Sequence, residues 1–310
     1  MKEIHKSVLL QEAIDSLSLK EDDIAVDMTL GFAGHSSEIL KRIKKGYLFA
    51  FDQDSEVFTY SRNRLNAIGN NFELIHANFS EAKEELLKRN ITKVDAILYD
   101  LGVSSYQLDN QERGFSYNND AVLDMRMNRD NPLTAKIVVN TYSEQELTRI
   151  FKLYGESKFA RNIARNIVNK RKEKEINTTL ELGSIIKEAV PIKERLKKHP
   201  AKQIFQAIRI EVNKELDVLI SSLNDSLDLL NVGGRLAVIT FHSLEDKIVK
   251  DTFRKVSETD SLSKGLPNIP EDKLPDFKII TKKGIVPTDK EEEENHRAHS
   301  ARLRVIERIK

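Results

Sequence analysis

Glycines and carboxylates stand where a nucleotide-like molecule could bind. The segment Gly31-Phe-Ala-Gly34 follows an apolar run and precedes a helical pattern, so its backbone N–H groups can approach a ligand at a helix N-terminus. Asp52 ends the next apolar run, about twenty residues later, where a carboxylate can accept hydrogen bonds from ribose hydroxyls. The pattern predicts a nucleoside-cofactor site, with a merely tight turn as the alternative.

The spacing of these glycines argues against a dinucleotide. It is not the G-x-G-x-x-G pattern that nicotinamide enzymes use to hold a pyrophosphate. S-adenosylmethionine has no pyrophosphate, so fewer glycines suffice for it. Phe79, just after the third apolar run, could lie against an adenine face, and ordinary core packing explains it equally well.

A second stretch has the features of amine chemistry. Asp100-Leu-Gly-Val-Ser-Ser-Tyr-Gln-Leu-Asp109 begins at the C-terminal edge of the fourth predicted strand, beside the crevice where open α/β sheets bind ligands. The exocyclic amine of a base is a poor nucleophile because its lone pair is delocalised into the ring. Asp100 and the carbonyls after it could accept the N–H protons and favour attack on a sulfonium methyl group. An aspartate that only caps a turn is the alternative.

These residues are positioned by strands that alternate with helices from Ile24 to Asp100. Such alternation predicts a parallel sheet covered by helices on both faces. The predicted strands are residues 24–29, 47–51, 72–76 and 94–99, and the predicted helices are 36–45, a segment ending at Ile68, and 80–90.

The alternation stops after about Val103, and helical patterns dominate as far as Ile210. Capping boxes are predicted where Ser143 and Thr178 are each followed by an acid three residues later. A helix is predicted over 156–172, and a long helix over 201–230 leads back to the sheet. Residues 234–241, 277–281 and 302–308 supply three more strands, residues 257–276 a loop, and residues 290–294 a solvated loop.

Composition limits the function classes. The net charge of the 310 residues is +1, so any contact with nucleic acid must come from local basic patches. The absence of cysteine excludes disulfides and thiolate metal sites and is typical of a reducing cytoplasm. No segment approaches the roughly 20 apolar residues of a membrane span. We therefore expect a cytoplasmic protein with no membrane partner.

Several longer motifs, in order along the chain, resemble one family. The segments 5–12, 100–109, 112–116, 123–127, 205–213 and 241–246 are similar to the bacterial 16S ribosomal RNA cytosine-N4 methyltransferases (RsmH, formerly MraW). The resemblance implies that S-adenosylmethionine binds at Ala33, Gly34, His35, Asp52, Phe79, Asp100 and Gln107. It also implies a substrate cytosine in the decoding region of small-subunit ribosomal RNA, free or in the assembled 30S particle.

Two positions depart from the family pattern. Ala33 stands where the family usually has the first glycine of Gly-Gly-His. Its methyl group needs a permissive backbone angle and is expected to narrow the approach of the cofactor slightly. His299 stands where the family usually has an arginine, which puts a phosphate contact at that position in doubt.

Candidate substrate residues have alternative explanations inside the protein. Arg113, Arg126, Arg209 and Asn213 could contact phosphate or base, and internal ion pairs with Asp109, Asp124 or Glu211 are the alternative. His242 borders the predicted crevice and could touch substrate. Ser243 with Asp246 is predicted to cap a helix, which argues against a metal site formed by His242, Glu245 and Asp246.

A basic segment and a few aromatic residues are further candidates. Lys193, Arg195, Lys197, Lys198 and His199 form a basic patch that could bind RNA or simply face solvent. Tyr106, Phe115 and Tyr117 could stack on a flipped base, and packing under the helical region is the alternative.

Together these features predict a class I S-adenosylmethionine-dependent methyltransferase, an α/β Rossmann-like sheet with a helical insertion. Residues 1–104 and 211–310 would form the methyltransferase domain, and 105–210 the substrate-recognition insertion. Asp100 is the candidate catalytic residue. Direct transfer to cytosine N4 agrees with the lack of cysteine, because methylation at cytosine C5 normally needs a thiolate. No metal is expected, and a homodimer is compatible with the sequence. The rival hypotheses are a nicotinamide or small-molecule enzyme and a catalytically silent ribosome-assembly protein.

Overall fold

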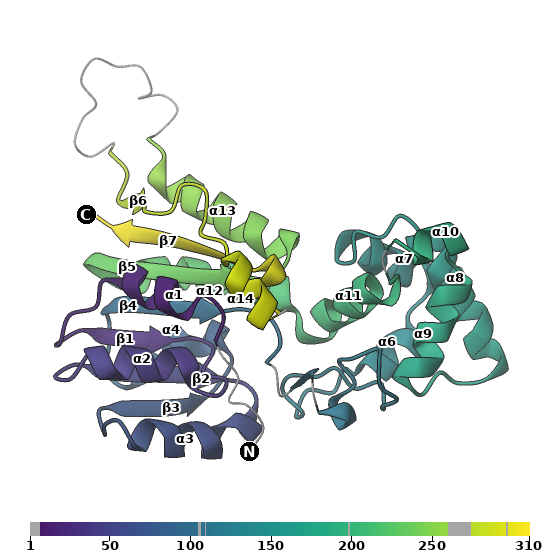
Figure 1. Cartoon of the computed structure of the whole chain (residues 1–310), viewed down its shortest axis with the longest axis horizontal. Helices are drawn as coiled ribbons and strands as arrows, with labels where there is room; N and C mark the ends of the chain where they lie inside the picture. Colours follow the sequence, from purple (N-terminus) through teal and green to yellow (C-terminus); the bar gives the residue numbers. More distant parts are fainter. Residues whose placement is uncertain (1–6, 105–106, 109, 198, 260–273, 296) are drawn as a thin grey trace. The chain divides into compact units, whose positions relative to one another are not determined.

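The apolar runs after the first helix pair into one seven-stranded sheet (Figure 1). The computed structural model describes residues 7–104, 107–108, 110–197, 199–259, 274–295 and 297–310. His5, Tyr106, Asp109, Lys198 and most of the predicted loop 257–276 lie outside these residues.

The strand order is β3-β2-β1-β4-β5-β7-β6. Neighbouring strands from β3 to β5 are parallel, whereas β7 runs antiparallel to both β5 and β6. This topology confirms the predicted class I methyltransferase fold. The strands are β1 (Ile24–Asp27), β2 (Tyr47–Asp52), β3 (Phe72–His76), β4 (Val94–Asp100), β5 (Leu230–Thr240), β6 (Phe277–Ile279) and β7 (Arg302–Arg308).

Helices cover both faces of the sheet because successive strand residues point to opposite sides. Along β4, Ala96 and Leu98 belong to one apolar cluster, while Ile97 and Tyr99 belong to the other. The first cluster includes residues of α1 (Leu10–Leu17), α2 (Gly34–Arg42) and α3 (Phe58–Asn66). The second includes residues of α4 (Ala82–Lys88), α12 (Glu215–Leu229) and α13 (Ser243–Ser257). The predicted two-sided coverage is confirmed.

The chain divides into two compact units, which we call the sheet unit (Met1–Gly102 and Leu216–Lys310) and the helical unit (Val103–Glu215). The helical unit has its own apolar core, to which Phe151, Ile163, Ile186 and Ile208 contribute. Its helices are α6 (Ala135–Thr141), α7 (Glu144–Leu153), α8 (Ala160–Glu173), α9 (Thr179–Glu188), α10 (Ile192–Arg195) and α11 (Ala201–Asn213). Short 3₁₀ turns are η1 (Ser55–Val57), η2 (Phe79–Glu81), η3 (Gln111–Arg113) and η5 (Ala298–Ser300).

Local capping chemistry explains several helix boundaries. The capping boxes predicted at Ser143 and Thr178 are both present, at the starts of α7 and α9. The long helix predicted over 201–230 is wrong: the chain breaks at Lys214, which adopts a left-handed conformation with φ +50°. The amide of Asn213 donates to the carbonyl of Met125 and accepts the N–H of Met127 at this point, and a left-handed residue is a common way to end a helix.

The predicted solvated loop over 290–294 is also wrong. These residues form most of α14 (Asp289–Glu294), whose first turn is capped by the hydroxyl of Thr288. Acidic side chains are favourable in the first turn because they face the positive end of the helix dipole. Glu291 accepts a 2.7 Å hydrogen bond from the backbone N–H of Leu9. None of the helices in the described part of the chain combines the length and apolar character needed to cross a membrane.

Candidate active site

The turn after β1 is held by a buried carboxylate. Asp27 accepts hydrogen bonds from the hydroxyl of Ser36 (2.6 Å) and the N–H of Thr29 (3.0 Å). Burial raises the pKa of Asp27, although these hydrogen bonds oppose the rise. The hydroxyl of Thr29 in turn accepts the N–H of Asp100 at 2.7 Å. The end of β1 is thus tied to α2 and to the end of β4.

The backbone at Ala33 has the permissive angle expected from the sequence. It lies just before α2 with φ +58°, in the left-handed region that glycine adopts more readily. Its methyl group is fully buried in the same apolar cluster as α1 and α2, so it does not line the solvent side of the turn. The expected narrowing of the cofactor's approach at Ala33 stays a prediction. Gly34 follows, and a side chain there would collide with the hydroxyl of Ser7.

Asp52 closes the same turn from the end of β2. One carboxylate oxygen accepts the N–H of Gly31 and the other accepts the N–H of Asp54, both at 2.9 Å. Burial raises the pKa of Asp52 to about 6. Each carboxylate oxygen has two lone pairs, so the group can still accept hydrogen bonds from two hydroxyls. Its assignment to the cofactor ribose stays a prediction with a compatible geometry.

Phe79 begins η2, beyond the end of β3, and is partly buried. Its ring meets Tyr99 edge to face at 5.4 Å, and its carbonyl accepts the hydroxyl of Ser222. The residue as a whole keeps intermediate exposure beside this contact. Phe79 is therefore both anchored to the core and accessible, as a ring that supports a base must be.

Asp100, at the end of β4, is the most unusual carboxyl group in the described part of the sheet unit. Its side chain keeps 26% exposure, yet its Oδ1 atom is buried and has no hydrogen-bond partner among the described residues. Burial, together with repulsion from Asp27 and Glu245, raises the pKa of Asp100 to about 8. A buried oxygen without a partner is costly, and a ligand that donates a hydrogen bond would satisfy it.

His35 lies beside Asp100 and is held neutral. Burial lowers the pKa of His35 to about 4. Its Nε2 is 3.2 Å from the carbonyl of Val8, a pure acceptor, so Nε2 must carry the proton. Nδ1 then presents a lone pair to Oδ2 of Asp100, 3.5 Å away. This arrangement suits a protonated Asp100 better than an ionised one.

His242 forms the cap of α13, which corrects the predicted cap at Ser243. The Nδ1 atom of His242 accepts the N–H of Glu245 at 3.4 Å, and the Glu245 carboxylate accepts the N–H of Phe241 at 2.8 Å. Asp246 instead forms a two-point ion pair with Arg304, at 2.7 and 3.0 Å. These contacts give the three side chains structural roles, while contact between His242 and substrate stays a prediction.

Gln107, the remaining predicted cofactor residue, belongs to the helical unit. Its side-chain oxygen accepts the N–H of Ser104 at 3.0 Å, and its own N–H binds the Ser104 hydroxyl. The side chain is 4% exposed. These two contacts with Ser104 lie within the segment that follows β4.

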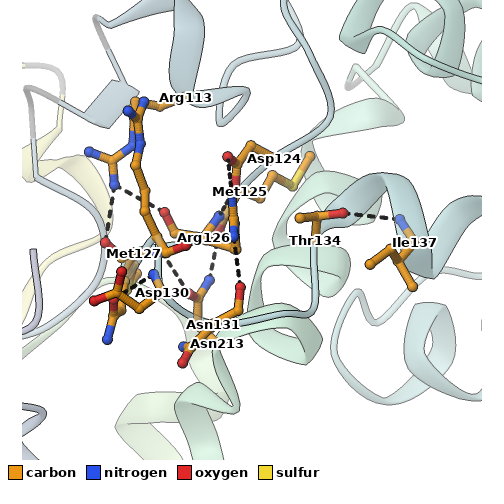
Figure 2. A network of polar contacts seen from close by, with 12 residues as sticks. Arg113, Asp124, Met125, Arg126, Met127, Asp130, Asn131, Thr134, Ile137 and Asn213 are labelled. Carbon is orange, nitrogen blue, oxygen red and sulfur yellow. Dashed lines mark hydrogen bonds and ion pairs between the residues drawn. The ribbon is translucent and has the colours of Figure 1, made fainter.

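The four predicted substrate residues of the helical unit make internal contacts, and Figure 2 shows those of Arg113, Arg126 and Asn213. Arg113 is fully buried and donates to the carbonyls of Arg126 and Met127 at 3.0 and 3.1 Å. The amide of Asn213 donates to the Met125 carbonyl and accepts the N–H of Met127, both at 2.8 Å. Both side chains therefore fix the loop 125–127, and the buried Arg113 side chain offers no surface to RNA.

The other two arginines form ion pairs. Arg126 binds Asp124, as one of the alternatives from the sequence anticipated, at 2.7 and 3.0 Å. Arg209 binds Glu215 at 2.8 and 2.9 Å rather than the anticipated Glu211. Glu211 instead accepts the hydroxyl of Tyr142. A role of Arg126 or Arg209 at RNA stays a prediction, and each would have to act beside its carboxylate partner.

The basic segment around α10 is mostly exposed. Lys193 and Lys197 are exposed, Lys197 pairs with Glu194 at 2.7 Å, and Arg195 donates to the carbonyl of Val190. Next to it, His199 stacks on Tyr117 with ring centroids 4.6 Å apart. Phe115 is 6% exposed and belongs to the apolar core, so it is not available to stack on a base.

His299 is exposed and lies 2.8 Å from the carboxylate of Glu292. Sequence reasoning missed Asp27 and Glu245 as parts of the site. Asp27 ends a strand as Asp52 and Asp100 do, so the same strand-end signal could have found it. Sequence reasoning treats Glu245 only as a possible metal ligand, because its effect on the charge of Asp100 depends on the packing of α13.

Comparison with known proteins identifies the family of the chain. The chain matches the model of the MraW methylase family over residues 2–309. Proteins named "Ribosomal RNA small subunit methyltransferase H" from Limosilactobacillus fermentum and Streptococcus mutans are 51% and 53% identical to it. A third, from Exiguobacterium sibiricum, is 50% identical. Each alignment covers 99% of this chain and 98% of the relative. The chain belongs to the MraW methylase family.

Proposed function

We propose that this protein methylates small-subunit ribosomal RNA with S-adenosylmethionine, and that the acceptor is N4 of a cytosine in the decoding region. The names of the half-identical relatives support the RNA class. The residue resemblance supports the cytosine. The observation that carries the chemistry is the buried, unpartnered Oδ1 atom of Asp100 at the C-terminal edge of β4.

The residues present fit the cofactor. The N–H groups at the start of α2, the carboxylate of Asp52 and the ring of Phe79 would hold its amino-acid, ribose and adenine parts. When bound, S-adenosylmethionine supplies a methyl group activated by a positively charged sulfur.

Asp100 would act on the acceptor amine. An ionised Asp100 would accept a hydrogen bond from the N–H group of cytosine N4, which increases the availability of the nitrogen lone pair. It would then take the proton that leaves N4. The backbone carbonyls after Asp100 are the alternative acceptors. The helical unit would recognise the RNA, with the exposed lysines of α10 providing phosphate contacts. A ribosomal substrate places this reaction in the cytoplasm.

The test is methyl transfer to small subunits that lack the modification. We expect labelled methyl groups in the RNA, and nucleoside mass spectrometry with chromatographic standards to identify N4-methylcytidine. The appearance of 5-methylcytidine, or of no label with RNA still bound, would overturn the proposal. Calorimetry with S-adenosylmethionine and NAD separates it from a nicotinamide enzyme.

The role of Asp100 is tested by single turnover with saturating cofactor. Asp100→Asn keeps the shape and one acceptor but removes the charge, so turnover should fall by about 10²–10⁴-fold. Asp95→Asn is the matched control, because Asp95 lies at the other end of β4 and binds the N–H of Ile24 and the amide of Asn231. Near-normal saturated turnover in Asp100→Asn would restrict Asp100 to cofactor binding.

A further inference from the structure

Within the described part of the chain, the charges that act on Asp100 are those of Asp27 and Glu245, and no positive charge compensates them. Three elements near it contribute an acid or a neutral base: β1 contributes Asp27, α13 contributes Glu245 and α2 contributes His35. Among the described residues no donor reaches Oδ1 of Asp100. The carboxylates of Asp27 and Glu245 are held in place by hydrogen bonds from Ser36 and from the backbone of Phe241.

His35 cannot supply the missing charge. Its Nε2 proton is directed to the Val8 carbonyl, and its Nδ1 lone pair faces Oδ2 of Asp100. A protonated carboxyl group can donate toward that lone pair, whereas an ionised one is repelled by it. The geometry therefore favours the neutral form of Asp100 until a cation arrives.

We propose that Asp100 holds a proton in the free protein and releases it when a sulfonium binds, so that the site distinguishes S-adenosylmethionine from its neutral, demethylated product. The inference rests on the proposed function. The two ligands share the adenosine, the carboxylate and the ammonium group, and they differ by one positive charge at sulfur. Opposite charge in a partly buried site favours the ionised carboxylate.

The proton that Asp100 releases and later regains also accounts for the proton that methyl transfer produces. The carbon–sulfur bond breaks and the carbon–nitrogen bond forms, so the positive charge on sulfur disappears. The N4 proton passes to Asp100, which becomes neutral at the moment its counter-charge is lost. The site then contains a neutral carboxyl group and a neutral thioether, and the product loses the charge pairing that favoured the cofactor.

Proton-linked calorimetry tests this directly. S-adenosylmethionine and S-adenosylhomocysteine are titrated into the full-length protein at pH 7 and pH 9, in buffers of different ionisation enthalpy. Since the pKa of Asp100 is about 8, S-adenosylmethionine should release about 0.9 proton at pH 7 and bind about tenfold more tightly at pH 9. S-adenosylhomocysteine should release markedly fewer protons. The sulfonium lowers the pKa of the ammonium group in S-adenosylmethionine, so the proton release of each ligand is corrected for its own ammonium titration, measured without protein. Asp52, with a pKa of about 6, is mostly ionised throughout.

Variants assign the proton. Asp100→Asn should abolish the difference in proton release between the two ligands, and Asp95→Asn should retain it. Equal proton release for both ligands in the unmodified protein would overturn the inference while leaving the proposed function intact. Failure to bind S-adenosylmethionine at all would overturn the proposed function itself. The comparison of the two ligands uses the unmodified protein, so it tests the inference even if Asp100→Asn does not fold.

Discussion

Replacing Asp100 by asparagine should change how the stability of the sheet unit depends on pH. The folded pKa of Asp100, about 8, lies above the ordinary value of 3.8 that the unfolded chain approaches. The stability contributed by the neutral group is therefore complete below pH 3.8 and is lost as the pH rises toward 8. Between those values the unfolded state binds one proton fewer, which corresponds to about 1.4 kcal/mol per pH unit.

This slope gives the change in the free energy of unfolding between pH 5 and pH 7. That change does not depend on the folded pKa of Asp100, provided that this pKa lies well above 7. From pH 5 to pH 7 the free energy of unfolding of the unmodified protein should fall by about 3 kcal/mol relative to Asp100→Asn. Other groups, including Asp27 and Asp52, titrate in both proteins and cancel in the difference.

Unfolding in urea is monitored through the hydrogen exchange of peptides from β1 and β4, so that only the unfolding of the sheet unit is measured. Two units that unfold separately would otherwise distort a whole-chain signal. Asp95→Asn serves as the control, and its curve of unfolding free energy against pH should run parallel to that of the unmodified protein. If the curves for Asp100→Asn and the unmodified protein also run parallel from pH 5 to pH 7, Asp100 is ionised in the fold and the reasoning is refuted.

Three further outcomes are expected. Arg113→Ala should cost the helical unit about 3–5 kcal/mol, since a buried and a partly buried carbonyl lose their donor and the side-chain stem leaves a cavity. Arg149→Ala, which removes an exposed pair with Glu211, should cost less than about 1 kcal/mol; equal losses of exchange protection in the two variants would contradict this. Asp52→Ala should weaken S-adenosylmethionine binding by about 1–3 kcal/mol in calorimetry, and unchanged affinity in a folded variant would remove Asp52 from the site. Neutralising the four basic residues of 193–198 together should lower RNA affinity and flatten its salt dependence without changing cofactor binding; an unchanged salt slope would make the segment a solvated face.

The sheet was predictable because its signals are local. Apolar runs of strand length, each ending on a polar residue, alternate with amphipathic segments, and Ser143 and Thr178 carry complete capping boxes within four residues. The break at Lys214 was not predictable in this way. Lysine favours helices, and the interactions of Asn213 that end α11 involve a loop almost ninety residues earlier in sequence.

The candidate site likewise has features that local sequence predicts and features that depend on tertiary packing. The strand-end positions of Asp52 and Asp100 follow from the alternation, but the charge environment of Asp100 depends on Glu245 and His35, which tertiary packing brings near. Arg113 shows the limit most clearly. Arginine is rarely buried, and nothing adjacent to it in sequence reveals that the carbonyls of Arg126 and Met127 will surround its guanidinium group.

The division of the sheet unit into two segments has a consequence for the order of folding during synthesis. Strand β4 lies between β1 and β5, yet β5 leaves the ribosome only after the entire helical unit. Until then β4 is an open edge, and such edges invite pairing with other chains. The helical unit, by contrast, is continuous in sequence and has its own core. It can therefore fold first, while the half-built sheet depends on chaperones or on rapid completion for protection from aggregation.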